Sequence, residues 1–179
     1  MIGREDQLKS LNQNYASSKS NLTILYGRHG TGKTTLIKEF IKDKKSFYYK
    51  AVPADDFEQN GMFGRAAGIE SDSYYEIMKT LRDRGIMLFV VEEFHNIIKT
   101  DSDFMADVSR LVRDEPKVMV ILSCSSVAWV ENSMVKARDE MKNKICKEHG
   151  FELIRVENSY ARRYNYIKNI LIQYFKSIR

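Results

Sequence analysis

Apolar residues along this chain form two kinds of pattern, short continuous runs and longer stretches with helical spacing. The short runs are rich in β-branched and aromatic residues and predict buried strands. They occupy residues 21–26, 46–52, 85–91, 117–124 and 151–156. Helical spacing follows residue 33 and recurs at residues 73–84 and 101–115. Strands that alternate with helices predict an α/β fold, a parallel sheet of about five strands sandwiched by helices in three layers.

Local signals mark where several of these segments begin and end. Ser73 and Glu76 have the spacing of a capping box at the start of one helix. Pro116 ends the helix at 101–115. The predicted buried face of that helix comprises Phe104, Val108, Leu111 and Val112. Residues 53–70 contain three glycines and little periodicity, so we expect a mobile loop or a partner-binding surface there.

The most specific motif lies between the first predicted strand and the helix that follows it. Residues 27–34 read GRHGTGKT and match the phosphate-binding pattern G-x-x-x-x-G-K-[ST]. The glycines let backbone N–H groups turn toward a phosphate, and the helix aims the positive end of its dipole at the same point. The alternative is a glycine-rich turn with a fortuitous lysine, which the strand–loop–helix context makes rare.

Each position of this loop has an expected role. Lys33 would reach the β- and γ-phosphates and neutralise charge that develops during catalysis, and the Thr34 hydroxyl would ligate Mg²⁺. The phosphates would be bound by Gly27, Arg28, His29, Gly30, Thr31, Gly32, Lys33, Thr34 and Thr35.

A pair of acids directly follows the apolar run at 85–91. Parallel sheets bind ligands at the carboxyl ends of their strands. We therefore interpret Glu92 as the Walker B acid, which acts on Mg²⁺ through a water, and Glu93 as the base that polarises the attacking water. The alternative is a solvated strand end. Ser123 and Ser125, at the end of the strand at 117–124, are candidates to sense the γ-phosphate, or they belong to an ordinary serine-rich turn.

These motifs together resemble the archaeal-type AAA-like ATPase domains of prokaryotes, within the STAND and AAA+ group of P-loop ATPases. The resemblance rests on IGREDQL at residues 2–8, LYGR at 25–28, VVEEFHN at 90–96 and LSCSS at 122–126, and it covers residues 1–130. It implies that a further strand lies between the Walker A strand at 21–26 and the Walker B strand at 85–91. It also implies that a glutamate is catalytic. It also implies that Ile2, Gly3 and Arg4 lie near the adenine, although Arg4 could instead be a solvated charge at a helix start.

Three departures from the family pattern are visible. Glu92 stands where the family typically has aspartate, and Cys124 stands where glycine is common. The helical lid of AAA+ proteins is not recognisable. We expect residues 1–158 to form the ATPase core, with the family's N-terminal signature at 1–20, and residues 159–179 to form a basic, aromatic helix that could begin a lid.

Charge and composition narrow the setting. The net charge is +5, and residues 1–137 are balanced, so the excess lies in residues 138–179. That segment could contact nucleic acid, but its aromatic residues fall near helical spacing, which favours packing on the core. Cys124 and Cys146 lack metal-ligand or redox spacing and predict thiols in a reducing cytoplasm. No run has transmembrane length and no signal segment is evident.

The sequence therefore predicts Mg²⁺-dependent binding and hydrolysis of ATP, with ADP as product, that drives conformational change in a protein or nucleic-acid partner, with self-association possible. An arginine finger could come from Arg138, Arg162 or Arg163, although each could be an ordinary surface arginine. One alternative is a nucleotide-gated scaffold with little turnover. Another is a phosphotransferase on the same P-loop framework.

Overall fold

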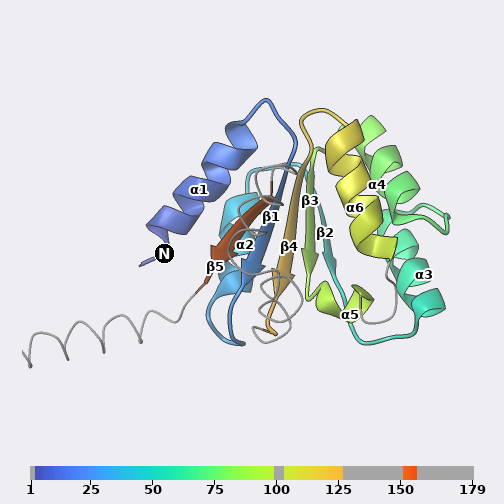
Figure 1. The fold of residues 1–179 in the computed structure, drawn as a ribbon, viewed down its shortest axis with the longest axis horizontal. Helices are drawn as coiled ribbons and strands as arrows, with labels where there is room; N and C mark the ends of the chain where they lie inside the picture. Colours follow the sequence, from blue (N-terminus) through green and yellow to red (C-terminus); the bar gives the residue numbers. More distant parts are fainter. Residues whose placement is uncertain (1–2, 99–102, 127–150, 157–179) are drawn as a thin grey trace, which may run out of the picture.

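The computed structural model describes residues 3–98, 103–126 and 151–156. Its centre is a five-stranded sheet in the order β2-β3-β4-β1-β5, and all four pairings are parallel (Figure 1). The strands are β1 (Asn21–Tyr26), β2 (Ser46–Lys50), β3 (Leu88–Glu92), β4 (Met119–Cys124) and β5 (Phe151–Arg155). The predicted strands and the α/β class are confirmed, and β4 lies between β1 and β3, as the resemblance implies.

Two helices cover one face of the sheet, α1 (Glu5–Ala16) and α2 (Lys33–Ile41) (Figure 1). Their apolar side chains and one face of the strands form one hydrophobic core. It includes Leu11 of α1, Leu36, Ile37 and Phe40 of α2, and Leu25, Val90 and Ile121 of the strands.

Four helices belong to the other side of the sheet, α3 (Asp56–Ala67), α4 (Tyr74–Asp83), α5 (His95–Ile98) and α6 (Asp103–Asp114) (Figure 1). Edge-to-face ring contacts anchor α3, because Phe63 lies between Phe47 and Tyr49 of β2 and Tyr74 of α4. The buried face predicted for the helix at 101–115 is confirmed in α6, where Phe104, Val108, Leu111 and Val112 are buried.

The expectation of a mobile loop at 53–70 is wrong, because residues 56–67 form the regular helix α3. Asp55 caps its first turn by accepting from the Glu58 N–H, and Gly68 ends it with φ +65°. Gly64 permits close packing inside the helix, since a Cβ there would meet the Ile69 carbonyl oxygen at 2.6 Å. These glycines serve packing and capping, and they do not break the helix.

The capping serine predicted for α4 is confirmed. Ser73 Oγ accepts from the Glu76 N–H at 3.3 Å. Asp107 of α6 accepts from both Ser73 Oγ and the Tyr75 N–H, so one carboxylate ties the start of α4 to α6 and thereby joins the two helices.

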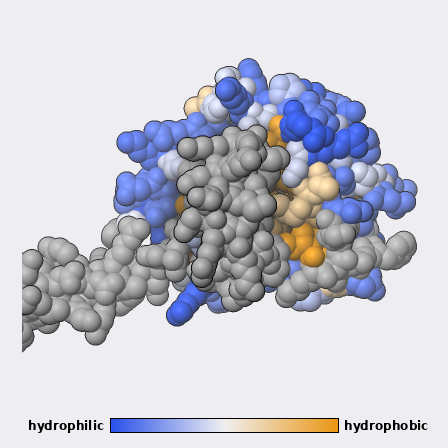
Figure 2. Space-filling view, viewed as in Figure 1, coloured by the Kyte–Doolittle hydropathy of each residue, from blue (hydrophilic) through white to orange (hydrophobic). Residues whose placement is uncertain are grey.

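Among the described residues, the large apolar side chains that are exposed are those of Tyr15 and Val52. Figure 2 shows hydrophilic residues over most of the described part of one face, with apolar residues in a small patch near its middle. Among the described residues, no helix combines the length and apolar character needed to cross a bilayer. Ile2, the predicted C-terminal helix at 159–179, Cys146, and the arginine-finger candidates Arg138, Arg162 and Arg163 lie outside the described residues.

Candidate functional site

The carboxyl ends of the three central strands meet at one edge of the sheet. Backbone bonds fix this meeting, since the Gly27 N–H donates to the Cys124 carbonyl at 3.3 Å and the Phe94 N–H donates to the Ser123 carbonyl at 3.1 Å. The P-loop after β1, the acids at the end of β3 and the serines of β4 are thereby brought together. Open parallel sheets bind their ligands at this edge.

The P-loop presents an open cradle and an uncapped helix start. Gly30 and Gly32 have φ of +77° and +86°, and a Cβ built on either meets nothing within 4 Å. No side chain caps α2, which begins at Lys33. The first N–H groups of a helix lack partners within the helix, so this loop and the start of α2 offer backbone donors and a positive dipole end to an anion.

Lys33 lies inside this cradle with only 6% of its surface exposed. Its ammonium donates to the Gly27 carbonyl at 2.7 Å and to the Arg28 carbonyl at 3.1 Å. Burial lowers the pKa of Lys33, and the negative charges of Glu93 and Glu92 partly oppose that shift. The lysine and both acids therefore share one electrostatic environment, although they are far apart in sequence.

Other P-loop side chains are solvent-facing. Arg28, His29, Thr34 and Thr35 are exposed, and Thr31 is buried. The Thr31 hydroxyl donates to the Arg28 carbonyl at 2.9 Å, which closes the loop on itself. The exposed Thr34 hydroxyl sits in the first turn of α2, where the motif would use it for a metal ion.

Arg4 connects the N-terminal segment to the P-loop. It is only 7% exposed, and its Nη2 donates to the Thr31 carbonyl at 2.5 Å. The alternative of a solvated arginine at a helix start is therefore wrong. Gly3 precedes it with φ +80°, and its N–H donates to Glu5 Oε1.

Glu92 is the most deeply buried acid of the site, at 1% exposure. Its Oε2 accepts from the Tyr48 hydroxyl of β2 at 2.7 Å. Its Oε1 is buried and has no hydrogen-bond partner among the described residues. An unpartnered buried carboxylate oxygen is costly, so this atom fits a role as ligand to a cation or to cation-bound water.

No group of three or more His, Cys, Asp or Glu side chains in the described part of the chain could hold a metal alone. Mg²⁺ usually takes one or two protein ligands together with waters and substrate phosphates. The orphan oxygen of Glu92 and the Thr34 hydroxyl therefore fit Mg²⁺ delivered with a nucleotide.

Glu93 points in another direction from Glu92 because its backbone leaves the strand. Its φ is +54°, an uncommon value for a residue other than glycine, found at turns and functional sites. Its Oε2 accepts from the Ser125 hydroxyl at 2.7 Å and the Ser125 N–H at 3.1 Å. His95 Nδ1 lies 3.3 Å from the same oxygen and 3.5 Å from Cys124 Sγ.

The two serine candidates have different surroundings. Ser125 contacts Glu93 directly, whereas Ser123 is buried in β4 and pairs in register with Glu92. Register partners on parallel strands share a face of the sheet, so Ser123 lies on the face that carries Glu92.

Sequence reasoning gave no role to Tyr48 or His95. Tyr48 belongs to a run interpreted only as a strand, and its link to Glu92 spans 44 residues. His95 follows the acids closely in sequence, and this proximity was the one local signal for it.

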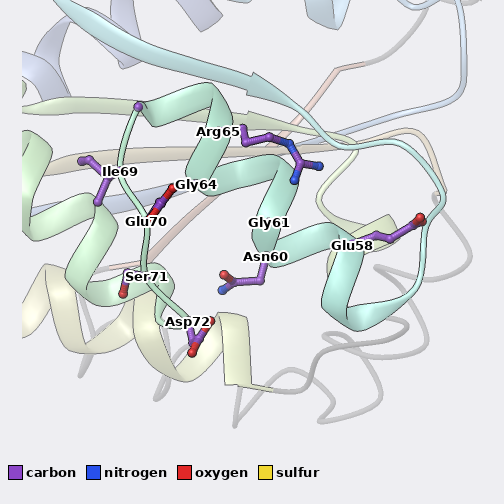
Figure 3. A pocket seen from close by; sticks show the side chains of 10 residues that line it. Glu58, Asn60, Gly61, Gly64, Arg65, Ile69, Glu70, Ser71 and Asp72 are labelled. Carbon is purple, nitrogen blue, oxygen red and sulfur yellow. The ribbon is translucent and has the colours of Figure 1, made fainter.

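A hollow lies along α3 and the segment that follows it (Figure 3). Its lining includes Glu58, Asn60, Arg65, Glu70 and Asp72. None of the predicted site residues lines it, so it is separate from the P-loop.

Comparison with known proteins points to the same chemistry. The model of the ATPase family associated with various cellular activities (AAA) matches residues 23–149. An uncharacterized protein of Methanocaldococcus jannaschii is 23% identical over 149 residues, which are 78% of this chain and 33% of that protein. An uncharacterized ATP-binding protein of the same organism is 46% identical over 44 residues, which are 25% of this chain and 75% of that protein. This chain thus spans a third of the first relative's length.

Solved structures share the fold. A Signal Transduction ATPase with Numerous Domains (STAND) from Pyrococcus horikoshii, with a tetratricopeptide repeat sensor, has a TM-score of 0.53 and 14% identity. The match covers 87% of this chain and 23% of that chain. The Aeropyrum pernix ORC1 protein, solved in complex with DNA, has a TM-score of 0.54 and 17% identity, over 88% of this chain and 45% of that chain.

Proposed function

The chain belongs to the AAA family of ATPases, and we propose that it binds ATP with Mg²⁺ and hydrolyses the bond between the β- and γ-phosphates. The observation that carries this proposal is the buried Lys33 ammonium. It lies at the uncapped start of α2 and interacts electrostatically with Glu92 and Glu93. A cation, backbone donors and two acids at one sheet edge are the parts that phosphoryl transfer to water requires.

The proposed roles follow from the position of each group. The loop at 27–35 holds the phosphates through backbone N–H groups, and Lys33 stabilises negative charge on the β- and γ-phosphate oxygens. Thr34 and Oε1 of Glu92 would hold Mg²⁺, which when bound neutralises phosphate charge. Arg4 fixes the N-terminal segment against the loop, beside which Ile2 and Gly3 would contact the adenine.

Glu93 is the proposed general base. A base must reach the proton that it accepts and be held in a productive direction. The Ser125 hydroxyl and N–H provide that hold at one carboxylate oxygen. Ser125 would thus couple the base to the end of β4, while Ser123 stays beside Glu92 on the neighbouring strand.

A partner that responds to nucleotide state belongs to the same proposal. The first relative described above and both solved structures are longer than this chain. One of the solved structures carries a repeat sensor, and the other is bound to DNA. We infer that nucleotide-dependent movement acts on a protein or a nucleic acid, or on a second copy of the chain. The buried thiol of Cys124, which is not in a disulfide, suits a reducing compartment such as the cytoplasm.

The test is steady-state phosphate release with ATP and Mg²⁺, with nucleotide binding measured on the same samples. We expect turnover by the wild type, loss of binding in Lys33→Ala, and binding without turnover in Glu93→Gln. Glu39→Gln, an exposed position on α2, is the matched control and should behave as wild type. Absence of nucleotide binding by the wild type would refute the proposal.

A nucleotide-gated scaffold with little turnover is the second candidate. The observation that favours it is that three donors or potential donors surround one oxygen of Glu93, which weakens that oxygen as a base. On this account the wild type binds ATP, and Glu93→Gln leaves the slow rate of phosphate release unchanged.

A further inference from the structure

Tyr48 reaches the acid of the metal site from the neighbouring strand. It pairs in register with Val90, two residues before Glu92, and Lys50 pairs with Glu92 itself. Two strand residues span about 6.6 Å, close to the length of a tyrosine side chain directed along the strand. The Tyr48 hydroxyl therefore arrives level with Glu92 and donates to its Oε2 at 2.7 Å.

The two oxygens of Glu92 consequently have different surroundings. Oε2 is engaged by Tyr48, whereas Oε1 is buried without a partner among the described residues. Glutamate has one more rotatable bond than aspartate, and holding it in one rotamer costs entropy. A hydrogen bond to one oxygen fixes that bond and settles where the other oxygen points.

The donor type suits the task. A tyrosine hydroxyl is neutral, so it orients the carboxylate without cancelling its negative charge, as a lysine or arginine would. An ordinary tyrosine hydroxyl keeps its proton at neutral pH, so it acts as a donor to the carboxylate, as the structure shows.

We propose that Tyr48 is a positioning residue for the cation site: its hydroxyl holds Oε2 of Glu92 so that Oε1 is presented to Mg²⁺ or to a water bound to it. This inference rests on the proposed function, because it concerns the same site. Tyr48 allows a glutamate to serve at this position, because its hydrogen bond restricts the rotation that the additional methylene would otherwise permit.

The experiment measures how Mg²⁺ strengthens binding of the slowly hydrolysed analogue AMP-PNP, first in EDTA and then across a Mg²⁺ titration. For Tyr48→Phe we expect unchanged affinity in EDTA, and a Mg²⁺ midpoint raised about 3- to 10-fold, the size of one net hydrogen bond. Tyr49→Phe is the matched control. It removes a hydroxyl from the adjacent residue on the same strand, one that faces Gln59, and it should titrate as wild type.

A double-mutant cycle with Glu92→Asp separates positioning from packing. The shorter carboxylate is withdrawn from the Tyr48 hydroxyl, so adding Tyr48→Phe to Glu92→Asp should change the Mg²⁺ midpoint by less than about twofold. Urea unfolding of all variants identifies any that are not folded.

Two results would overturn the inference. One is a folded Tyr48→Phe protein whose Mg²⁺ midpoint equals that of the wild type, and the other is an equal loss of affinity in EDTA and in Mg²⁺. If the wild type binds AMP-PNP without any help from Mg²⁺, the metal role in the proposed function fails and this inference fails with it. A wild type that responds to Mg²⁺ beside a Tyr48→Phe that responds equally leaves the proposed function standing and rejects only Tyr48.

Discussion

Replacement of Gly27 by alanine tests whether the P-loop and strand β5 are built as one unit. A Cβ at Gly27 would lie 2.0 Å from the Val156 carbonyl oxygen and 3.1 Å from its carbonyl carbon. Val156 is itself fixed, because its N–H donates to the Tyr26 carbonyl at 2.7 Å. The clash involves backbone on both sides, so no side-chain rotation can relieve it.

The size of the effect follows from the gap that must open. Close C···O contacts lie at about 3.3 Å, so the end of β5 would have to move by more than about 1 Å from β1. Overpacking of this kind costs about 1–3 kcal/mol, and more when backbone must shift. We therefore expect Gly27→Ala to lower the free energy of unfolding by about 3 kcal/mol, a large share of a typical domain's stability.

Gly30→Ala is the matched control within the same loop. A Cβ at this position would meet nothing within 4 Å, and its φ of +77° is the only obstacle. The strain of a left-handed residue costs about 1 kcal/mol. Urea unfolding without nucleotide should therefore rank wild type above Gly30→Ala and Gly30→Ala above Gly27→Ala. Only Gly30→Ala should lose nucleotide affinity while keeping most of its stability, because its Cβ enters the cradle.

A reversal of that order would refute this reasoning. If Gly27→Ala unfolds at the wild-type urea concentration, the end of β5 does not pack on the P-loop as described. If Gly30→Ala is the less stable variant, the loop is limited by its backbone conformation and not by its contact with β5.

Three further predictions concern the site. Burial lowers the pKa of Lys33, so ATP affinity should persist below that pKa and fall as the pH rises through it, at a lower pH than an exposed lysine would allow. Binding titrations from neutral pH upward should show this fall in the wild type and equally in the control Lys38→Gln, which changes an exposed lysine. Ser125→Ala should leave ATP affinity unchanged but lower phosphate release about 2- to 10-fold, because Glu93 loses one orienting hydrogen bond; a faster rate would mean that the serine restrains the base. Arg4→Met should destabilise the nucleotide-free protein by about 1–2 kcal/mol in urea unfolding, since it removes a buried charge-assisted bond to the P-loop, and an unchanged midpoint would contradict that contact.

Features encoded over short stretches of chain were predictable from the sequence. The first predicted strand and β1 coincide at residues 21–26, because a β-branched run ends directly at the glycine of the P-loop. The buried face of α6 was also predictable, since helical spacing alone selects its apolar positions. The motif at 27–34 carries its mechanism within itself, because its backbone and its helix are contiguous.

Helix α3 shows where local reasoning was incomplete. Three glycines and little periodicity at 53–70 suggested a loop. However, Asp55 and Glu58 mark the start of a helix there, and Gly68 marks its end. Gly64 has no Cβ, and the Ile69 carbonyl packs into the space that a Cβ would fill. That contact exists only after the chain has folded back, so propensity could not reveal it.

The acid pair shows the same limit at the level of function. Glu92 and Glu93 are adjacent and chemically identical, and their place after an apolar run predicted two acids at the site but not which neighbours would hold each of them. In the fold, Glu92 continues the strand and meets Tyr48 of β2, whereas the positive φ of Glu93 turns it toward Ser125 beyond β4. The sheet order places β3 between β2 and β4, so each acid is held by a different neighbouring strand. Their proposed division into metal ligand and base therefore follows strand order, and exchanging the partners of either acid should alter one proposed role without the other.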